Sequence, residues 1–328
     1  MSALKRRHVV LGVAVTVVAV VVGGGVVVSD RLGIEIVPPS PQRYAERAVD
    51  RMGAGIRSSP EQLATVRQRV ADAVREAEEY GDTYDALRGA TTDLGGGHSA
   101  FLTPAEAEKT FGRSESGSTA EDPTVRTSKG VTTVVVPTLV SGDQEVTDRW
   151  VRVISRGLDR AREDTDVGWI VDLRDNHGGN IWPMLAALSP LLTDGRVMTF
   201  EYADRSDDVS IDGDRAMLRG TVQADAPGSM PKSDLPVAVL VNGMTGSSAE
   251  GVAISFTGQR NVRTFGEPTY GYSTANQPIR LYDGAVVNLT VAVDADRTGQ
   301  RYGDPLVPDV GSAPEQVAAT AEVWLRRR

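Results

Sequence analysis

From Val131 onward, short apolar runs alternate with longer amphipathic stretches, and this alternation limits the possible folds more than anything else in the 328 residues. The runs have the length and β-branched content of strands, and the stretches between them have helical spacing. Such alternation is typical of an α/β fold. The expected strands cover 131–140, 169–173, 237–241 and 262–265, and the expected helices cover 144–162, 181–192 and 247–257. The turns after 169–173 and 237–241 should face each other.

The part of the chain before Val131 has a helical pattern instead. Residues 38–94 carry apolar side chains at helical spacing, and Ser59 begins one helix as its N-cap. Three glycines at 95–97 end this pattern, and a second capping box starts a short helix over 103–111. His98 therefore lies in a loop between two helices of a small helical cap.

The remaining segments complete the expected organisation. Residues 112–129 are polar without periodicity and predict an exposed, flexible loop. A turn at Asp283-Gly284 predicts a hairpin, and a capping pattern that begins at Ser312 predicts a C-terminal helix. The predicted division is an N-terminal segment (1–30), the cap (38–111), the loop (112–129) and an α/β core (130–328).

Residues 9–28 are apolar or small and carry no charge, which is long enough to cross a bilayer as a helix. Lys5, Arg6 and Arg7 precede them, so the positive-inside bias places the N-terminus in the cytoplasm and the rest of the chain outside. The sequence therefore predicts a cell-membrane protein with a single transmembrane anchor. A cleaved signal peptide is the alternative, but the apolar stretch is longer than signal peptides carry.

Composition excludes several kinds of chemistry. The chain has no cysteine and three histidines, which excludes disulfides, thiolate zinc sites and a cysteine nucleophile. We predict no metal and no cofactor. The formal charge is −9, and the first 28 residues hold three basic groups and no acid, which leaves −12 on the remainder. This charge disfavours nucleic acid and suits a cationic peptide, although the solubility of an exported protein explains it equally well.

Ser247 is the candidate nucleophile, because small residues begin a helix directly after the buried strand 237–241. A serine at a helix N-terminus offers an exposed hydroxyl together with backbone N–H groups that can bind a developing oxyanion. This arrangement suits acyl transfer. The alternative is that Ser247 or Ser248 is only an N-cap.

A serine nucleophile needs a base, and the candidates are few. The lysines are Lys5, Lys109, Lys129 and Lys232, so none follows Ser247. Ser229 and Lys232 form a Ser-x-x-Lys string, but Pro231 would break the helical turn that such a pair requires. His8 precedes the anchor, which leaves His98 and His177.

His177 belongs to a second turn between a strand and a helix, in the string VDLRDNHGGN. Its paired glycines, Gly178 and Gly179, permit positive φ and a close approach of the backbone. This turn could cradle an oxyanion, and the alternative is an ordinary turn with glycine for steric reasons.

Three segments together resemble the tail-specific, or C-terminal processing, serine peptidase family: GGGHSAFLTPAEAE, WIVDLRDNHGGN, and VLVNGMTGSSAEGVA followed by VRTFGEPTYGY. In the processing branch the base is a lysine 25 residues after the nucleophile, a position that Tyr272 occupies here. The position four residues later, often glutamine in that branch, is Asn276. The processing branch also carries a PDZ domain between its first motif and the DLR motif. Only about 70 residues separate His98 from Asp172 here, which leaves no room for that domain.

These departures resemble the nisin-resistance-protein subgroup, bacterial peptidases that cleave lantibiotics near the C-terminal end. The resemblance implies a crotonase-like ββα core with a helical cap, and a serine endopeptidase with a Ser-His dyad formed by Ser247 and His98. The oxyanion donors are then Ser248 with Gly178 or Gly179. The predicted substrate-binding residues are Asn180, Ile181, Thr245 and Glu250.

Two points stay open at this stage. The third member of the catalytic site could be Asp93, Glu250 or Asp304, each of which could equally be a capping or surface acid. The function could also be housekeeping cleavage of other exported peptides, or sequestration of peptides without cleavage.

Overall fold

The computed structural model describes residues 38–111, 121–141 and 143–328. The expected anchor at 9–28 lies outside these residues, as does the 112–120 part of the expected loop. Within the described ranges, no helix is both long and apolar enough to span a membrane. Residues Ser40–Arg328 form one compact unit.

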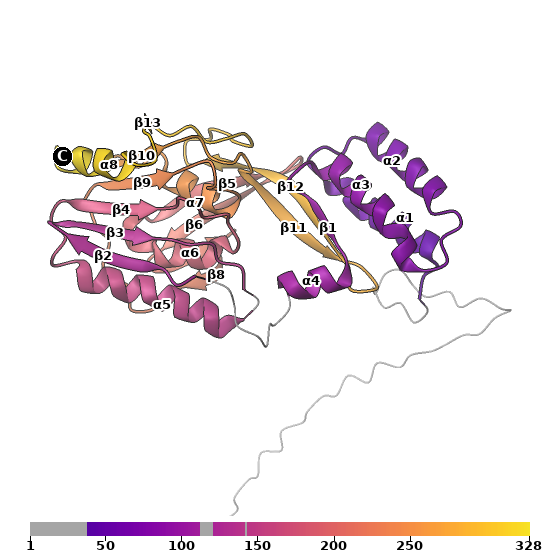
Figure 1. Cartoon of the computed structure of the whole chain (residues 1–328), viewed down its shortest axis with the longest axis horizontal. Coiled ribbons are helices and arrows are strands. Elements are labelled where there is room, and N and C mark those ends of the chain that lie inside the picture. The colour runs from indigo at the N-terminus through magenta and orange to yellow at the C-terminus, as the bar shows by residue number, and fades with distance from the viewer. Residues whose placement is uncertain (1–37, 112–120, 142) are drawn as a thin grey trace, which may run out of the picture. The chain divides into compact units, whose positions relative to one another are not determined.

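A six-stranded sheet lies within residues 124–311 (Figure 1). Neighbouring strands are parallel, except that β2 runs antiparallel to β3. The order is β13 (Val310–Gly311), β10 (Val262–Gly266), β9 (Val237–Val241), β4 (Gly168–Asp172), β3 (Val131–Val135) and β2 (Thr124–Ser128). Two expectations were wrong here: the strand expected over 131–140 ends at Val135, and β2 lies inside the stretch 112–129 that was expected to be a loop.

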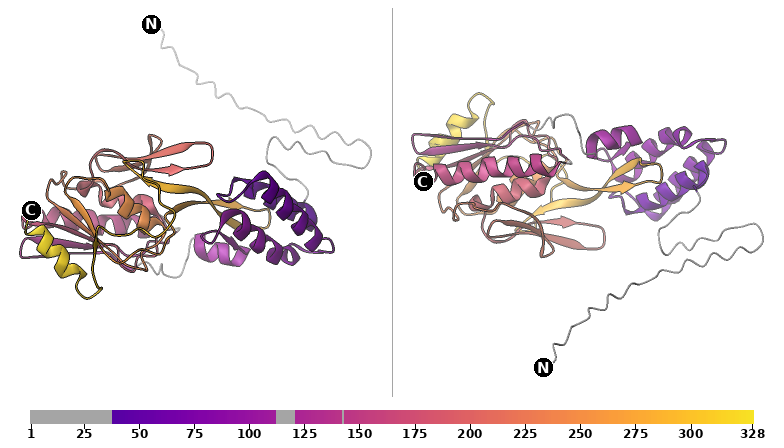
Figure 2. Two further views of the ribbon diagram at one scale, coloured as in Figure 1. Left: turned by 90° about the horizontal axis from the view of Figure 1, so that it is seen from above. Right: turned by 90° about the horizontal axis from the view of Figure 1, so that it is seen from below.

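Helices cover both faces of this sheet (Figure 2). Side chains alternate along β9, so that Val237 and Val239 belong to the main core while Ala238 and Leu240 belong to a smaller core on the other face. The main core is covered by α5 (Gln144–Ala161), α6 (Ile181–Ala187) and α7 (Ser248–Phe256), and the smaller one by α8 (Val317–Leu325). The expected α/β architecture is present. However, α8 begins with Gln316 as its N-cap rather than at the expected Ser312.

A second sheet has seven strands and is antiparallel. Its order is β1 (Ala100–Leu102), β12 (Val286–Asp296), β5 (Gly195–Glu201), β6 (Ser206–Asp212), β7 (Arg215–Leu218) and β8 (Thr221–Asp225), with β11 (Thr274–Arg280) also paired to β12. The hairpin expected at Asp283-Gly284 is confirmed as the turn between β11 and β12. The sequence analysis did not foresee the meander from β5 to β8.

The cap consists of short helices, several with the expected N-terminal caps. They are α1 (Pro41–Arg51), η1 (Met52–Ala54), α2 (Pro60–Ala73), η2 (Tyr80–Thr83), α3 (Tyr84–Gly95) and α4 (Pro104–Phe111). Ser59 Oγ accepts the backbone N–H of Gln62 at 3.1 Å. Thr103 N–H donates to Glu106 Oε2 at 2.8 Å, which confirms the second capping box.

The cap shares its hydrophobic core with the long strand β12. Val49 of α1 and Leu87 of α3 pack in the same cluster as Val287 and Leu289 of β12. At the tip of the β11–β12 hairpin, Asp283 accepts hydrogen bonds from the hydroxyls of two cap tyrosines, at 3.0 and 2.7 Å. The hairpin therefore joins the cap to the rest of the unit, and its base carries residues of the candidate site.

Candidate active site

The turns that follow β4 and β9 are tied directly to each other. Asp175 N–H donates to Asn242 Oδ1 at 3.1 Å, and Asn242 Nδ2 donates back to Asp175 Oδ1 at 2.9 Å. The Gly246 N–H donates to the Asn176 carbonyl at 3.0 Å. Because the carboxyl ends of neighbouring parallel strands share one sheet edge, β4 and β9 bring the two turns together. The expectation that these turns face each other is confirmed.

Ser247 has a strained backbone at the start of α7. It is the N-cap residue, as the simpler alternative expected, but its φ of 55° and ψ of −125° are sparsely populated by residues with a side chain. The backbone N–H donates to Glu250 Oε2 at 2.8 Å, and the residue is partly exposed. A sharp turn from strand to helix with a strained, accessible serine is the geometry of a nucleophile elbow.

Of the three expected oxyanion donors, Gly179 and Ser248 have a backbone N–H that makes no hydrogen bond within the described residues. The Gly178 N–H already donates to Asn176 Oδ1 at 2.8 Å. In the part of the chain that the structure describes, no hydrogen bond engages the N–H of Gly179 or Ser248. The Ser248 hydroxyl donates to the Gly179 carbonyl at 2.6 Å and so holds these two residues together. The Gly178 N–H is therefore not available to an oxyanion in this structure, which leaves Gly179 and Ser248 as the candidate donors.

Gly178→Ala should lower the rate of reaction at Ser247 strongly. The glycine has a φ of 100°, and a Cβ there would lie 2.9 Å from Ser247 Cβ and 2.8 Å from the Gly246 carbonyl oxygen, so the two turns must separate. We expect the rate to fall by about 100- to 1000-fold, because separating the turns moves the Gly179 N–H away from Ser247, and this is the usual cost of one lost oxyanion donor. The rate of labelling by a fluorophosphonate measures it. Gly228→Ala, at another positive φ but with nothing near its Cβ, is the control, and equal effects would contradict the steric argument.

His98 is held by residues at the base of β11. Its Nδ1 lies 2.7 Å from Thr274 Oγ1, and its ring stacks on Tyr272 with centroids 4.5 Å apart and an interplanar angle of 17°. The His98 carbonyl accepts a hydrogen bond from Asn276 Nδ2 at 2.9 Å. Burial lowers the pKa of the imidazole from 6.5 to about 4, so the ring is neutral at pH 7.

Glu250 links the turn at Ser247 to Tyr272, the residue on which the His98 ring stacks. Its Oε2 accepts the backbone N–H groups of both Ser247 and Tyr272, each at 2.8 Å, so those two nitrogens lie within twice that distance of each other. Its Oε1 accepts the Gly271 N–H at 2.9 Å and the Thr269 hydroxyl at 2.5 Å. His98 therefore stacks on a residue that neighbours Ser247, although no direct hydrogen bond between His98 and Ser247 is present among the described contacts.

Three of the four expected substrate-binding residues are buried. Glu250 and Thr245 have no exposed surface, and the Thr245 hydroxyl donates to the Leu173 carbonyl at 2.9 Å. Ile181 packs in the main core. Each of these three side chains is used inside the fold, and a direct contact with substrate stays a prediction. Asn180 is exposed, and its side chain caps α6 by accepting the N–H of Trp182 at 3.1 Å.

The expected acids do not orient the imidazole. Asp93 forms an ion pair with Arg69 on the cap surface, and Glu250 serves backbone N–H groups. The described contacts of His98 include none with Asp93, Glu250 or Asp304. Thr274 takes that place, and the sequence analysis missed it even though it lies between the two positions singled out by the resemblance, 272 and 276. Nor does His177 touch the nucleophile in the described contacts; it is exposed, and its N–H donates to Thr138 Oγ1 at 2.8 Å.

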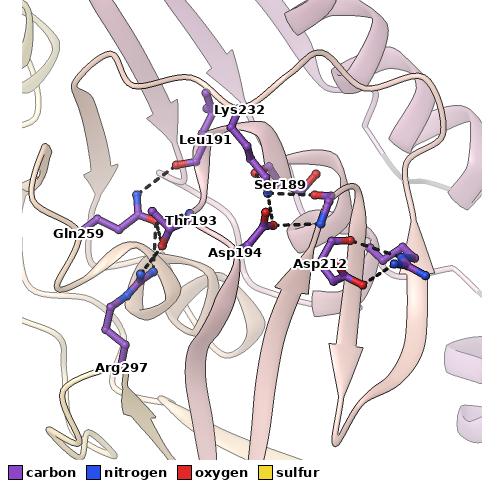
Figure 3. A network of polar contacts seen from close by, with 10 residues as sticks. Ser189, Leu191, Thr193, Asp194, Asp212, Lys232, Gln259 and Arg297 are labelled. Atoms are coloured by element: carbon purple, nitrogen blue, oxygen red, sulfur yellow. Dashed lines mark hydrogen bonds and ion pairs between the residues drawn. The ribbon is translucent and has the colours of Figure 1, made fainter.

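Lys232 is part of a separate polar network (Figure 3). Its ammonium group donates to the carbonyls of Ser189 and Gly213, at 3.0 and 2.9 Å, and lies 2.9 Å from Asp194. The Ser229 hydroxyl donates to a backbone carbonyl instead. The Ser-x-x-Lys string is therefore not a catalytic pair.

Arg297, which Figure 3 shows beside Thr193 and Gln259, also fixes the C-terminal end of α7. Its guanidinium donates to the carbonyls of Ser255 at 2.7 Å and Thr257 at 3.1 Å, and to the Thr193 hydroxyl at 2.6 Å. A cation at a helix C-terminus satisfies unpaired carbonyls and complements the helix dipole. Both ends of α7 are thus anchored.

The comparison with protein families agrees with this geometry. The model of peptidase family S41 matches residues 138–311, more than half of the chain. The chain belongs to peptidase family S41. It is accordingly a serine peptidase, and the family expected from the three motifs is confirmed.

Individual relatives lie in two groups. The nisin-resistance protein of Lactococcus lactis subsp. lactis is 28% identical over 299 residues, which cover 90% of each chain. The carboxy-terminal processing protease of Bacillus subtilis is 29% identical over 171 residues, which cover 49% of this chain and 34% of that one. The similarity thus extends over nearly the whole chain only in the first case.

Solved structures share the fold. A lipoprotein from Streptococcus agalactiae aligns with a TM-score of 0.77 and 26% identity, over 90% of this chain and 100% of that one. The photosystem II D1 C-terminal processing protease aligns with a TM-score of 0.58 and 15% identity, over 88% and 98%. The second similarity shows the fold alone.

Proposed function

We propose that this S41 member is a membrane-anchored, extracytoplasmic peptidase that uses Ser247 as nucleophile and His98 as general base. The observation that carries the proposal is the placement of a neutral, partly buried imidazole on Tyr272, whose backbone shares Glu250 with the backbone of Ser247. A base must be neutral to accept a proton, and His98 is neutral at pH 7.

The reaction proceeds by acyl transfer. His98 removes the proton of Ser247 Oγ as that oxygen attacks the peptide carbonyl carbon, and the resulting oxyanion faces the N–H groups of Gly179 and Ser248. The C–N bond breaks as His98 gives its proton to the leaving amine. Water, deprotonated by His98, then attacks the acyl carbonyl carbon, the C–O bond to Ser247 breaks, and His98 returns the proton to Ser247 Oγ.

The proposed substrates are cationic, lantibiotic-like peptides, cleaved near their C-terminal end so that the cell resists them. The support is the similarity to the nisin-resistance protein over 90% of both chains and the charge of −12 beyond residue 28, which attracts cations. Residues 9–28 would anchor the enzyme, since the chain has no cysteine that could carry a lipid.

Substrate choice can be tested with the full chain in detergent. It is incubated with cationic lanthionine peptides and, separately, with unmodified peptide tails, and the products are read by mass spectrometry. We expect single cuts near the C-terminus of the lanthionine peptides. Cleavage of the unmodified tails alone would support housekeeping processing instead. Equal protection of cells by the wild type and Ser247→Ala would support sequestration.

The rate of labelling of Ser247 should fall on acidification only around pH 4. His98 acts in its neutral form, and burial lowers its pKa from 6.5 to about 4, so protonation removes the base only below that range. The measurement is the rate of labelling by a fluorophosphonate between pH 3 and 8, read with the protein folded. Tyr272→Ala uncovers the imidazole and should move the acid limb up toward 6.5, whereas Tyr272→Phe keeps the ring and the limb. An acid limb near 6.5 in the wild type would contradict the effect of burial on the pKa of His98.

A further inference from the structure

The imidazole of His98 can serve as a base through only one of its two nitrogens. Its Nδ1 is occupied by Thr274 Oγ1 at 2.7 Å. If that hydroxyl donates to Nδ1, the ring proton sits on Nε2 and neither nitrogen is free to accept a proton. If the hydroxyl accepts from Nδ1–H, the lone pair of Nε2 is free.

We infer that Thr274 is a positioning residue that accepts the Nδ1–H of His98 and thereby leaves Nε2 as the nitrogen that receives the Ser247 proton. This inference rests on the proposed function, because it assigns the tautomer that a base at this position requires. It gives Thr274 the orienting part that an aspartate plays in a Ser-His-Asp triad, with a neutral acceptor in place of a carboxylate.

The backbone of the histidine is fixed to the same strand as Thr274. The Ser99 hydroxyl donates to Thr290 Oγ1 at 2.9 Å, and the Thr290 hydroxyl donates to Asn276 Oδ1 at 2.8 Å. Asn276 Nδ2 then donates to the His98 carbonyl at 2.9 Å. These hydrogen bonds tie the backbone of His98 to β11 and β12, and the contact with Thr274 ties its ring to β11.

The ring itself has little freedom to flip. Tyr272 covers one face of it, and the Tyr272 hydroxyl donates to the Gly97 carbonyl at 3.0 Å, next to His98 in the chain. A flip about the Cβ–Cγ bond would turn the ring out of its stack on Tyr272 and break the contact between Nδ1 and Thr274. Thr274 therefore selects the tautomer while Tyr272 and Asn276 hold the orientation.

Nuclear magnetic resonance of the full chain, labelled with ¹⁵N at histidine and kept in detergent, reads the tautomer directly. The chain has three histidines, so the long-range imidazole spectrum is simple, and His98→Gln identifies the signals of His98. At pH 7 we expect a protonated, pyrrole-type Nδ1 and an unprotonated, pyridine-type Nε2. The reverse pattern in the wild type overturns the inference whatever the variants do.

Two matched variants test the effect on reactivity. Thr274→Val keeps the shape and removes the hydroxyl, so labelling of Ser247 by a fluorophosphonate should slow by about 100-fold, the lower range for general-base catalysis. Thr274→Ser should restore the wild-type tautomer and most of the rate. A folded Thr274→Val that labels at the wild-type rate, or a Thr274→Ser that does not recover, overturns the inference.

Failure of the proposed function would look different. If Ser247→Ala cleaved peptide as fast as the wild type, the Ser-His assignment would fall. The spectrum of His98 would still report whether Thr274 accepts its Nδ1–H.

Discussion

Ser247→Ala will lower the rate of peptide cleavage by about 10⁶-fold, the loss found when the nucleophile of a serine peptidase is removed. The variant keeps the backbone N–H that donates to Glu250, so the turn should stay folded. His98→Ala should cost a similar factor, because the two residues act as a unit, and the double variant should be no slower than either single one. Initial rates of cleavage, followed by mass spectrometry, measure all three.

The matched control for this prediction is Ser229→Ala. Ser229 belongs to the Ser-x-x-Lys string at 229–232, and its hydroxyl donates to the Ala226 carbonyl at 2.6 Å. Its cleavage rate should equal that of the wild type. Multiplicative losses from Ser247→Ala and His98→Ala in the double variant would show that the two residues act independently.

Glu250→Ala should lower the free energy of unfolding by about 3 kcal/mol or more, because each buried donor left without an acceptor costs about 1–3 kcal/mol. Glu250 has no exposed surface and accepts four hydrogen bonds from the Ser247, Gly271, Tyr272 and Thr269 groups described above. Its removal leaves these donors unsatisfied. It also removes the link between the turn at Ser247 and Tyr272, so labelling of Ser247 should be lost as well. Urea unfolding followed by circular dichroism measures the stability.

Two further variants separate charge from shape. Glu250→Gln keeps the shape but has only one acceptor oxygen, so its stability should lie between those of Glu250→Ala and the wild type. Glu267→Ala removes an exposed carboxylate nearby in the chain and should change the free energy of unfolding by no more than about 0.5 kcal/mol. A Glu250→Ala variant as stable as Glu267→Ala would refute the linking role of Glu250.

The elements that were predicted well are those with a complete local signal. Residues 237–241 and the helix from 144 were assigned nearly to their bounds, since a buried strand and an amphipathic helix each show their own period. The strand β2 was missed because its five residues are mostly exposed and polar. It forms only by pairing with β3, and no periodicity in 124–128 indicates that pairing.

The residues of the candidate site also fall into those that a local motif indicated and those that only the tertiary structure placed. The resemblance identified Ser247, His98 and the glycine turn, because their motifs are contiguous in the sequence. Thr245 and Glu250 were taken for substrate contacts, and only the tertiary structure shows that both are fully buried. A residue next to a nucleophile in sequence can point into the fold as easily as toward a substrate.

The sequence by itself determined the family, the α/β alternation, the lack of a lysine after Ser247 and the candidate nucleophile. Only the tertiary structure decided which groups surround the imidazole. His98 and Thr274 are 176 residues apart, and their contact arises because the β11–β12 hairpin packs against the cap while β1 pairs with β12. Local patterns record the period of each element, whereas such a contact depends on how distant elements share one core.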